Sequence, residues 1–549
     1  MQVYGDRSRT IAPCTALAEI ARRLEDSSEE ALTSALIEAG GLAQGLADLE
    51  FHAAGHDDVS DLQSAAMALA TAIAGRLLGT GDGADVSALR ALQGRRLPGT
   101  VQVRDAEGYA FYAVYPQAYA AAAASHAWEG RPLVIGLRSI GTSLAAIVAA
   151  ATGGEAVSMR PAGPPFRREA RASERLKARL AAHDGPFAIV DEGPGLSGSS
   201  FGCVADLLAS LGIAEERIVF MPSHAGDLGP NASPRHRERW SRARRLVRTL
   251  DDIAARDPVP GWFAAEVGSA ERIQDISGGA WRTGWRLEDW PPAVEVLERR
   301  KIRFRTASGD YSARFAGLGH YGEAKFARAQ ALHTAGFAPK PIALRRGFLL
   351  ERWVPGDRPH TSAADDGFLR HLGAYLAFRR DRFPASAEDG ANPVALMEMA
   401  RANAEALWGR AVADRVDGLL ARFRPAGEHK VHVDGRLHPW EWRLEGGAIV
   451  KLDAIDHSCG HDLVGAQDIL WDVAGARIEF DLEPSQLATL ARTVSVSPQD
   501  VLPVAACYAA FQAGLLSLPA SREEAPRLSR RRAMYRDRLM RVLREASAD

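Results

Sequence analysis

Short apolar runs that end in polar loops recur in the middle of the chain. Residues 187–190 form one such run and are followed directly by Asp191 and Glu192. Gly, Pro and Ser residues dominate the loop that follows, and apolar residues then recur at helical spacing over 204–211. This pattern predicts a buried strand, a polar loop and a helix, in that order.

The same strand–loop–helix pattern occurs upstream, in residues 132–145. Strands and helices alternate over 97–225, which predicts a mainly parallel sheet with helices on its faces. The N-terminal part is patterned as helix instead, with Ser27 and Glu30 as a capping box before an apolar stripe. We expect this part to be a helical cover for the sheet, because it carries no catalytic motif.

The pattern loosens after residue 225 and becomes regular again in the C-terminal half. Strands are predicted within 301–315, a helix over 323–335 and another strand within 448–456. We therefore predict four parts: a helical N-terminal region (1–95), a parallel-sheet α/β domain (96–225), a connecting segment (226–295) and an α+β C-terminal domain (296–549).

The loop after residues 187–190 has the composition of a phosphosugar site. Its backbone amides can converge on a phosphate at the positive end of the following helix. The carboxylates of Asp191 and Glu192 can hold ribose hydroxyls, either directly or through Mg²⁺. The candidate phosphate-binding residues are Ser197, Gly198, Ser199 and Ser200.

These segments resemble the signature of type I phosphoribosyltransferases, which use phosphoribosyl pyrophosphate (PRPP). The resemblance covers about residues 97–225 and implies a phosphoribosyltransferase-like parallel sheet, with Asp191 and Glu192 on the ribose. The loop after this pair is one residue longer than the family's, and a generic strand–glycine loop–helix turn is the alternative. The resemblance assigns PRPP's pyrophosphate to the loop of the upstream unit, with Arg138 as the cation beside Ser139, Gly141 and Thr142.

A second set of polar residues lies between 429 and 456. An Asp on a loop, a polar ligand a few residues later and a strand that ends in another Asp are the groups needed for phosphoryl transfer. His432, Val433 and Asp434 are followed by Glu441, and the strand ends at Asp453.

This spacing resembles the aminoglycoside phosphotransferase and choline kinase-like branch of the protein kinase fold. The resemblance covers about residues 300–549 and implies that Asp434 is the catalytic base. It implies that Glu441, in place of the family's Asn, and Asp453 bind Mg²⁺, with Asp456 as a competitor for the second position. The helix after them contains Asp468 and Asp472 where the family has a D-x-x-x-D-L-A pattern.

The resemblance also implies an ATP site in the first half of this domain. Residues 347–356 resemble the hinge that contacts adenine, with Glu351 to Trp353 as backbone contacts. The strand position that normally carries a phosphate-binding Lys holds Arg314 instead. Arginine is also a cation, but its planar fork is not equivalent to an ammonium group.

Composition excludes several classes of protein. The chain of 549 residues has a net charge of −2, which does not favour a nucleic-acid coat or a membrane-surface protein. Seven arginines between Arg235 and Arg248 are read as a solvated helix, with RNA contact as a weaker alternative. Four widely spaced cysteines and the lack of a secretory or membrane-spanning segment predict a reduced, cytoplasmic protein.

We therefore predict a bifunctional enzyme that transfers a phosphoribosyl group from PRPP and phosphorylates a small molecule with ATP. Both reactions would use Mg²⁺, and the product would be a nucleotide-like metabolite. The alternative is a regulatory protein that binds PRPP or nucleotide without turnover, which the changes at Arg314 and Glu441 favour. No motif identifies the acceptors or the oligomeric state.

Overall fold

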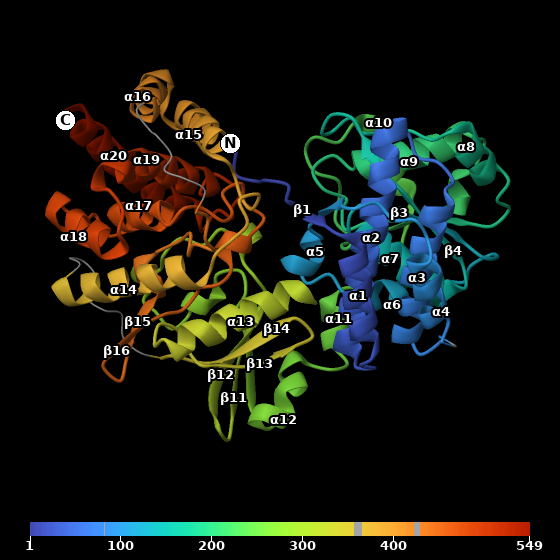
Figure 1. Cartoon of the computed structure of the whole chain (residues 1–549), viewed down its shortest axis with the longest axis horizontal. Coiled ribbons are helices and arrows are strands. Elements are labelled where there is room, and N and C mark those ends of the chain that lie inside the picture. Colours follow the sequence, from blue (N-terminus) through green and yellow to red (C-terminus); the bar gives the residue numbers. More distant parts are fainter. Residues whose placement is uncertain (82, 356–364, 422–428, 549) are drawn as a thin grey trace. The chain divides into compact units, whose positions relative to one another are not determined.

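The computed structural model describes residues 1–549 except 82, 356–364, 422–428 and 549 (Figure 1). The described chain divides into two compact units. The N-terminal unit contains Ser8–Trp262 and Gly317–Gly322, and the C-terminal unit contains Met1–Arg7, Phe263–Ala316 and Glu323–Asp549. In the described part of the chain, no helix is both long and apolar enough to cross a membrane.

A five-stranded sheet with the strand order β4-β3-β7-β8-β9 forms the centre of the N-terminal unit, and every pairing in it is parallel. The three central strands are buried along their whole length, as expected for a sheet covered on both faces. The predicted parallel sheet is therefore confirmed. Its strands are β3 (Leu133–Leu137), β4 (Glu155–Met159), β7 (Phe187–Val190), β8 (Ile218–Met221) and β9 (Arg244–Arg245).

Helices of the first hundred residues belong to the same unit as this sheet, and α2 and α3 both pack against α7. α2 is buried on all sides over most of its length, so it is an interior helix of the unit. The helices of the whole N-terminal unit are α1 (Pro13–Leu24), α2 (Glu29–Ala54), α3 (Asp61–Leu77), α4 (Ala84–Gln93), α5 (Glu107–Ala110), α6 (Pro116–Ala124), α7 (Gly141–Thr152), α8 (Glu174–Ala181), α9 (Ser199–Ser210), α10 (Pro234–Arg242) and α11 (Leu250–Ala254).

The predicted capping box at Ser27 is wrong by one residue. Ser28 is the N-cap of α2, and its hydroxyl accepts a hydrogen bond from the Ala31 amide at 3.3 Å. The hydroxyl of Ser27 instead accepts from Arg76 on α3. Two adjacent serines offer the same cap chemistry, so the pattern alone does not separate them.

Two antiparallel strand pairs complete the N-terminal unit. β1 (Ser8–Ile11) pairs with β2 (Val101–Arg104), and β5 (Pro161–Ala162) pairs with β6 (Glu169–Ala170) in the basic insert before α8. The arginine-rich segment forms α10 and β9. Trp240 of α10 is buried, stacks on Phe220 of β8 and thereby anchors the helix to the sheet, as the helical interpretation predicts.

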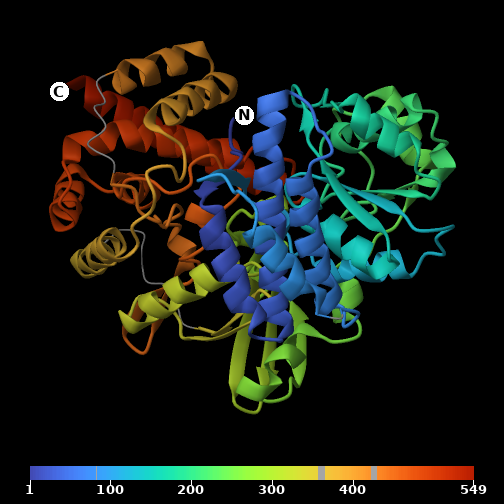
Figure 2. The ribbon, with the colours of Figure 1, turned by 45° about the vertical axis from the view of Figure 1, so that its right-hand side comes forward.

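The C-terminal unit begins with a five-stranded antiparallel sheet in the order β10-β11-β12-β14-β13. Helix α13 (His320–Thr334) connects β12 to β13, so the strands predicted within 301–315 and the helix after them are confirmed (Figure 2). The strands are β10 (Arg272–Asp275), β11 (Lys301–Thr306), β12 (Gly309–Phe315), β13 (Pro341–Arg345) and β14 (Phe348–Arg352).

A helical part with a short hairpin follows the sheet. β15 (Trp442–Glu445) pairs antiparallel with β16 (Ala448–Lys451), and every residue of α17 is buried. One large apolar cluster holds these helices together. The helices are α14 (Asp366–Arg382), α15 (Pro393–Trp408), α16 (Arg410–Leu420), α17 (Leu470–Glu479), α18 (Pro484–Val494), α19 (Pro498–Leu515) and α20 (Ala525–Ala548), with α12 (Ala264–Val267) before the sheet.

A buried carboxylate joins three of these helices. The side chain of Glu479 in α17 is 0% exposed and accepts hydrogen bonds from Tyr535 at 2.6 Å and Tyr508 at 3.1 Å. Arg531 of α20 forms an ion pair with it. Burial alone would raise the pKa of Glu479, but Arg531 and the nearby His438 dominate and lower the pKa to about 2.

We expect this carboxylate to make the C-terminal unit sensitive to acid. Because its pKa in the folded chain lies below its usual value near 4.5, its contribution is present above pH 4.5 and is lost as the pH falls towards 2. The shift corresponds to roughly 3 kcal/mol of unfolding free energy. Denaturant unfolding at pH 6, 4 and 3 should show a smaller acid loss in Glu479→Gln than in the wild type, with exposed Glu405→Gln as the control. An identical acid loss in all three proteins would contradict this assignment.

Candidate functional site

The predicted phosphosugar residues lie where the strand order of the parallel sheet reverses. β3 is flanked by β4 on one side and β7 on the other, so the chain leaves β3 and β7 in opposite directions along the sheet. Open parallel sheets bind ligands at such a point, outside the carboxyl ends of the strands. Arg138 directly follows β3, and Asp191 and Glu192 directly follow β7, so both segments reach this edge.

Asp191 and Glu192 are weakly compensated carboxyl groups. Glu192 Oε2 accepts from the Gly108 amide at 2.8 Å, and Tyr119 donates to the main-chain oxygen of Asp191 at 2.9 Å. Burial is the main cause that raises the pKa of Asp191 to about 7. Burial, and then the negative charges of Glu107 and Asp191, raise the pKa of Glu192 well above its usual range. Both groups are therefore suited to gain a hydroxyl or a cation as a partner.

Arg138 does not occupy the open position that a pyrophosphate-binding cation requires. Its side chain is 0% exposed, and its guanidinium lies 2.7 Å from Asp57 and 3.3 Å from Asp48. Its Nε donates to Ser158 at 3.0 Å, and Arg160 shares Asp48 with it. The predicted role of Arg138 on pyrophosphate thus conflicts with the structure, in which the side chain serves a buried ion-pair network.

The other residues of that loop are partly used in packing. A Cβ on Gly141 would lie 2.6 Å from the Val190 carbonyl oxygen, so the glycine lets α7 start directly against β7. Thr142 is fully buried, and Ser139 is half-buried and accepts from the Thr142 amide at 3.2 Å. The structure therefore brings Ser139 closest to an accessible position in this loop.

The serine-rich loop before α9 is folded back on itself. Gly198 is the N-cap of α9 with φ of 61°, and its amide donates to the Pro194 carbonyl at 3.0 Å. The Ser199 amide donates to the Ser197 hydroxyl at 3.2 Å. A Cβ on Gly198 would lie 2.5 Å from the Leu228 side chain, so Leu228 covers the loop there. Ser197 and Ser199 are buried, whereas Ser200 is half-buried.

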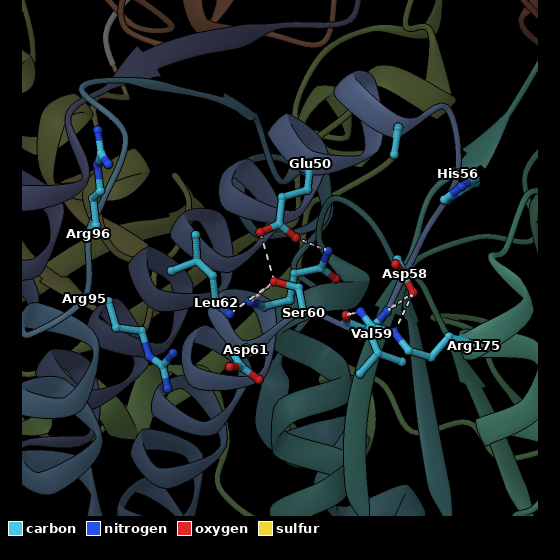
Figure 3. Close-up of a pocket in the computed structure, with 12 residues that line it drawn as sticks. Glu50, His56, Asp58, Val59, Ser60, Asp61, Leu62, Arg95, Arg96 and Arg175 are labelled. Atoms are coloured by element: carbon cyan, nitrogen blue, oxygen red, sulfur yellow. Dashed lines mark hydrogen bonds and ion pairs between the residues drawn. The ribbon is translucent and has the colours of Figure 1, made fainter.

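A separate hollow of about 650 Å³ lies in the N-terminal unit, between the end of α2, the start of α3 and α8 (Figure 3). Glu50 accepts from Ser60 at 2.9 Å and from Gln63 at 2.7 Å, and Asp58 lies 3.2 Å from Arg175. None of the residues predicted from the sequence to bind a ligand lines it. Its lining is Glu50, Ala54, His56, Asp58, Val59, Ser60, Asp61, Leu62, Gln63, Arg95, Arg96 and Arg175.

In the C-terminal unit, Asp472 fixes the loop that carries Asp434. The two carboxylate oxygens of Asp472, at the start of α17, accept from the Asp434 amide at 2.7 Å and the Gly435 amide at 2.9 Å. Gly435 has φ of 81°, a conformation that favours glycine, so the chain can turn sharply after Asp434. Burial and the charge of Asp434 raise the pKa of Asp472 to about 6.

The carboxylate of Asp434 is buried among polar partners. Tyr375 of α14 donates to Oδ2, and Lys451 Nζ lies 3.4 Å from the same oxygen. Oδ1 accepts from the Arg436 amide at 3.2 Å. Arg379 donates to the Tyr375 hydroxyl at 2.8 Å and so fixes that ring. The structure therefore holds the carboxylate of Asp434 in one orientation, beside the Lys451 ammonium.

The two predicted metal ligands lie together in the structure. Glu441 and Asp453 offer oxygen atoms that lie within 4.8 Å of each other. Lys451 Nζ is 2.6 Å from Glu441 and donates to the Asp453 carbonyl oxygen at 3.0 Å. Two carboxylates at this separation fit the oxygen preference of Mg²⁺.

Arg314 connects the sheet to the loop that carries Asp453. From β12, its guanidinium reaches Glu351 at 3.1 Å, Asp453 at 2.7 Å and Asp456 at 2.8 Å. Burial would lower the pKa of Arg314, but these carboxylates outweigh burial and raise it above its usual value. Lys325 of α13 also lies 3.0 Å from Asp456, so Asp456 has two cationic partners.

The predicted adenine contacts have partners within the C-terminal unit. The side chain of Glu351 is bound to Arg314, and the Trp353 amide donates to the Asp310 carbonyl at 3.0 Å. The Arg303 guanidinium lies over the Trp353 ring at 4.3 Å. Part of the hinge-like segment, from residue 356 onwards, lies outside the described residues.

Sequence reasoning missed three residues that shape this site: Lys325, Tyr375 and Lys451. Lys451 offered a signal, since it is a charged residue at the end of an apolar run, two positions before Asp453. Lys325 and Tyr375 lie on α13 and α14, and no local pattern marks them as partners of Asp456 and Asp434.

Comparisons with known proteins give matches at the level of structure alone. No protein-family model and no curated protein matches the chain. Choline kinase LicA from Streptococcus pneumoniae is 12% identical with a TM-score of 0.33, over 52% of this chain and 99% of that chain. Spectinomycin phosphotransferase APH(9)-Ia, solved with ADP and spectinomycin, is 12% identical with a TM-score of 0.37, over 53% and 97%.

Macrolide 2′-phosphotransferase MphH from Brachybacterium faecium is 16% identical with a TM-score of 0.33, over 53% of this chain and 96% of that chain. Identities below 25% and TM-scores below 0.5 do not assign this chain to a family. The functional argument therefore depends on the residues of this chain.

Proposed function

We propose that the C-terminal unit transfers a phosphoryl group from ATP to a hydroxyl group of a small molecule. The observation that carries the proposal is the meeting of two loops around Lys451. Its ammonium lies 3.4 Å from Asp434 and 2.6 Å from Glu441, and it donates to the Asp453 carbonyl oxygen at 3.0 Å. Phosphoryl transfer requires one carboxylate at the attacking hydroxyl and others near the phosphates, and this arrangement offers both.

Asp434 is proposed to be the base that accepts the proton of the attacking hydroxyl. Lys451 lies beside its carboxylate, and Tyr375 holds Oδ2 in place until the acceptor hydroxyl replaces it. Asp472 positions the loop by binding the amides of Asp434 and Gly435.

Glu441 and Asp453 are proposed to hold Mg²⁺, which when bound neutralises charge on the nucleotide phosphates. Arg314 now pairs with Asp453, and it would contact a phosphate oxygen when the nucleotide enters. Glu351 keeps the Nε side of Arg314 fixed during this exchange. Adenine would then lie along the segment from Glu351 to Trp353.

The test is transfer of labelled γ-phosphate from ATP to pooled hydroxylated metabolites at varied Mg²⁺ concentration. Asp453→Asn should raise the Mg²⁺ concentration required at least tenfold, because one of two carboxylate ligands is lost. Asp417→Asn is the matched control, since Asp417 is an exposed aspartate of α16 paired with Arg401 at 2.9 Å. An unchanged Mg²⁺ requirement in Asp453→Asn would remove Asp453 from the metal site.

A specific observation favours binding without turnover as the second candidate. The three carboxylates expected to serve metal and catalysis already have protein cations as partners: Asp453 has Arg314, while Glu441 and Asp434 share Lys451. A metal ion or substrate must compete with these cations. Saturable ATP binding without ADP formation would favour this candidate.

For the N-terminal unit, the expected phosphoribosyl transfer remains a proposal that depends on Asp191 and Glu192. Their position at the point of strand reversal favours a ligand there, whereas the buried ion pairs of Arg138 do not favour pyrophosphate binding by that residue. Release of pyrophosphate from PRPP that is lost in Asp191→Asn/Glu192→Gln would support it. PRPP binding without release would leave a binding role.

A further inference from the structure

The imidazole of His457 lies beside the two carboxylates of the candidate metal site. His457 begins a short helical turn, His457–Cys459, four positions after Asp453. Its Nε2 atom lies 4.0 Å from Asp453 Oδ2. One donor atom from each of Glu441, Asp453 and His457 lies within 4.8 Å of the other two. An imidazole nitrogen is therefore available as a third ligand beside the two carboxylates.

The Nε2 atom of His457 is buried and has no ordinary partner. Among the residues that the structure describes, no group forms a hydrogen bond with this nitrogen. Buried polar atoms in folded proteins are normally hydrogen-bonded, so an exception needs a physical reason. A metal ion bound between Nε2 and the Asp453 carboxylate would supply this reason, because imidazole is the commonest metal ligand among side chains.

Short segments of the chain bring the three donors together. The β15–β16 hairpin lies between Glu441 and Asp453, and the Leu452 amide donates to the Glu441 carbonyl oxygen at 2.8 Å. Gly435 leaves the space that His457 occupies, because a Cβ on this glycine would lie 3.1 Å from the His457 Cβ. The loop that carries the proposed base therefore also accommodates the imidazole.

The spacing of the donors is compatible with one shared ion. Donor atoms bound to one ion lie at most about twice the metal–ligand bond length apart, which is roughly 4.2 Å for bonds of about 2.1 Å. Nε2 of His457 and Oδ2 of Asp453 already meet this limit, and a small rotation of the Glu441 side chain would complete the set. The side chains of Glu441, Asp453 and His457 are 14%, 24% and 12% exposed, so an ion can reach them from solvent.

Protein cations surround the two carboxylates and affect which ion can bind. Lys451 lies 2.6 Å from Glu441 Oε2. Arg314 donates to Asp453 Oδ1 at 2.7 Å, and Lys301 lies 3.9 Å from Oδ2 of the same carboxylate. These charges oppose an ion such as Mg²⁺, which is held mainly by attraction to oxygen atoms. An imidazole nitrogen contributes its lone pair, which transition-metal ions bind better than Mg²⁺ does.

We propose that Glu441, Asp453 and His457 together bind a divalent ion of the first transition series, such as Mn²⁺, Co²⁺ or Zn²⁺, in preference to Mg²⁺. The donor set of two carboxylates and one imidazole carries this preference. The inference rests on the metal site of the proposed function and names the class of ion that this site takes. Metal binding by the chain alone does not require phosphoryl transfer, so the two proposals can be tested separately.

The first experiment titrates the metal-free full chain with Mn²⁺ in the absence of nucleotide, with Mg²⁺ as the competing ion. The wild type should bind Mn²⁺ at least about tenfold more tightly than Mg²⁺. His457→Gln should weaken Mn²⁺ binding at least about tenfold and Mg²⁺ binding less than about threefold, because the lost donor is a nitrogen. His333→Gln, which changes an exposed histidine of α13, should alter neither affinity. Equal affinities of the wild type for the two ions would overturn the proposal, as would unchanged Mn²⁺ binding in folded His457→Gln.

The second experiment identifies the nitrogen ligand by pulsed electron paramagnetic resonance of the Mn²⁺-loaded chain without ATP. A nitrogen nucleus coordinated to Mn²⁺ modulates the electron spin echo of the ion. This modulation is expected in the wild type and in His333→Gln and should be lost in His457→Gln. Metal binding with nitrogen modulation but no acceptor-dependent ADP formation would contradict phosphoryl transfer and support this metal site. A wild-type echo without nitrogen modulation would overturn the proposal, as would the same modulation in folded His457→Gln.

Discussion

Replacement of Asp434 by Asn is expected to lower phosphoryl transfer by the C-terminal unit at least about 100-fold. A positioned general base contributes about 10²–10⁴-fold to the rate, and an amide cannot accept the proton of the attacking hydroxyl. Asn retains the size of Asp, its one amide oxygen can still accept from the Arg436 amide, and Asp472 still binds the main-chain amides of residues 434 and 435, so the loop should keep its shape. The rate of ADP formation at saturating ATP and acceptor is the measurement.

Two comparisons make this result specific. Asp417→Asn changes an exposed aspartate of the same unit and should leave the rate within about twofold of the wild type. Nucleotide binding by Asp434→Asn should persist, because the base is not proposed to contact ATP. A folded Asp434→Asn protein with nearly full activity would show that Asp434 is not the base.

Replacement of Arg138 by Met is expected to destabilise the N-terminal unit by about 3–5 kcal/mol. This is the range observed when one partner of a buried ion pair is removed and the other charges stay buried. In this chain, Asp57 would lose a guanidinium at 2.7 Å, and Asp48 would lose one of its two arginine partners and retain Arg160 and the Gln44 amide. Denaturant unfolding of the full chain, followed by a probe in the N-terminal unit, measures the effect.

The control for Arg138→Met is Arg171→Met, because Arg171 is half exposed and pairs with the exposed Glu169. That change should shift the unfolding free energy by less than about 0.5 kcal/mol. If Arg138→Met were as stable as the control but lost PRPP binding, the phosphoribosyltransferase-based role of Arg138 would be restored and the structural role would be wrong.

Local patterns predicted the elements of both units well. Short apolar runs bounded by turn residues identified β3 and β7, and the predicted strands within 301–315 appear as β11 and β12. Such patterns depend on which face of each element is buried, and this information is present in a window of a few residues. The local pattern could not show whether Ser27 or Ser28 caps α2, because both serines can cap a helix.

The sequence also placed Asp434, Glu441 and Asp453 in one site, and the structure brings these residues together around Lys451. All three residues lie on a short stretch of chain that folds back through one hairpin, so a local pattern can group them. The cations that pair with these carboxylates were harder to predict from the sequence. Arg314 is 139 residues away from Asp453 along the chain, and its ion pair depends on tertiary packing.

The prediction for Arg138 was limited in the same way, because it also depended on a partner far away along the chain. Its position after β3 favoured a pyrophosphate contact, yet its partner Asp48 lies 90 residues upstream in a helix that carried no chemical motif. A buried arginine and an exposed arginine look alike in a single sequence. The tertiary contact between Asp48 of α2 and Arg138 after β3 decides which one Arg138 is.

The most direct test of the proposed function is ADP formation by the full chain with ATP, Mg²⁺ and pools of hydroxylated metabolites, run with and without a chelator. A phosphotransferase predicts ADP formation that requires both an acceptor pool and Mg²⁺ and that yields a phosphorylated product of matching amount. ATP binding with no acceptor-dependent ADP in any pool would contradict phosphoryl transfer and leave nucleotide binding as the role of the C-terminal unit.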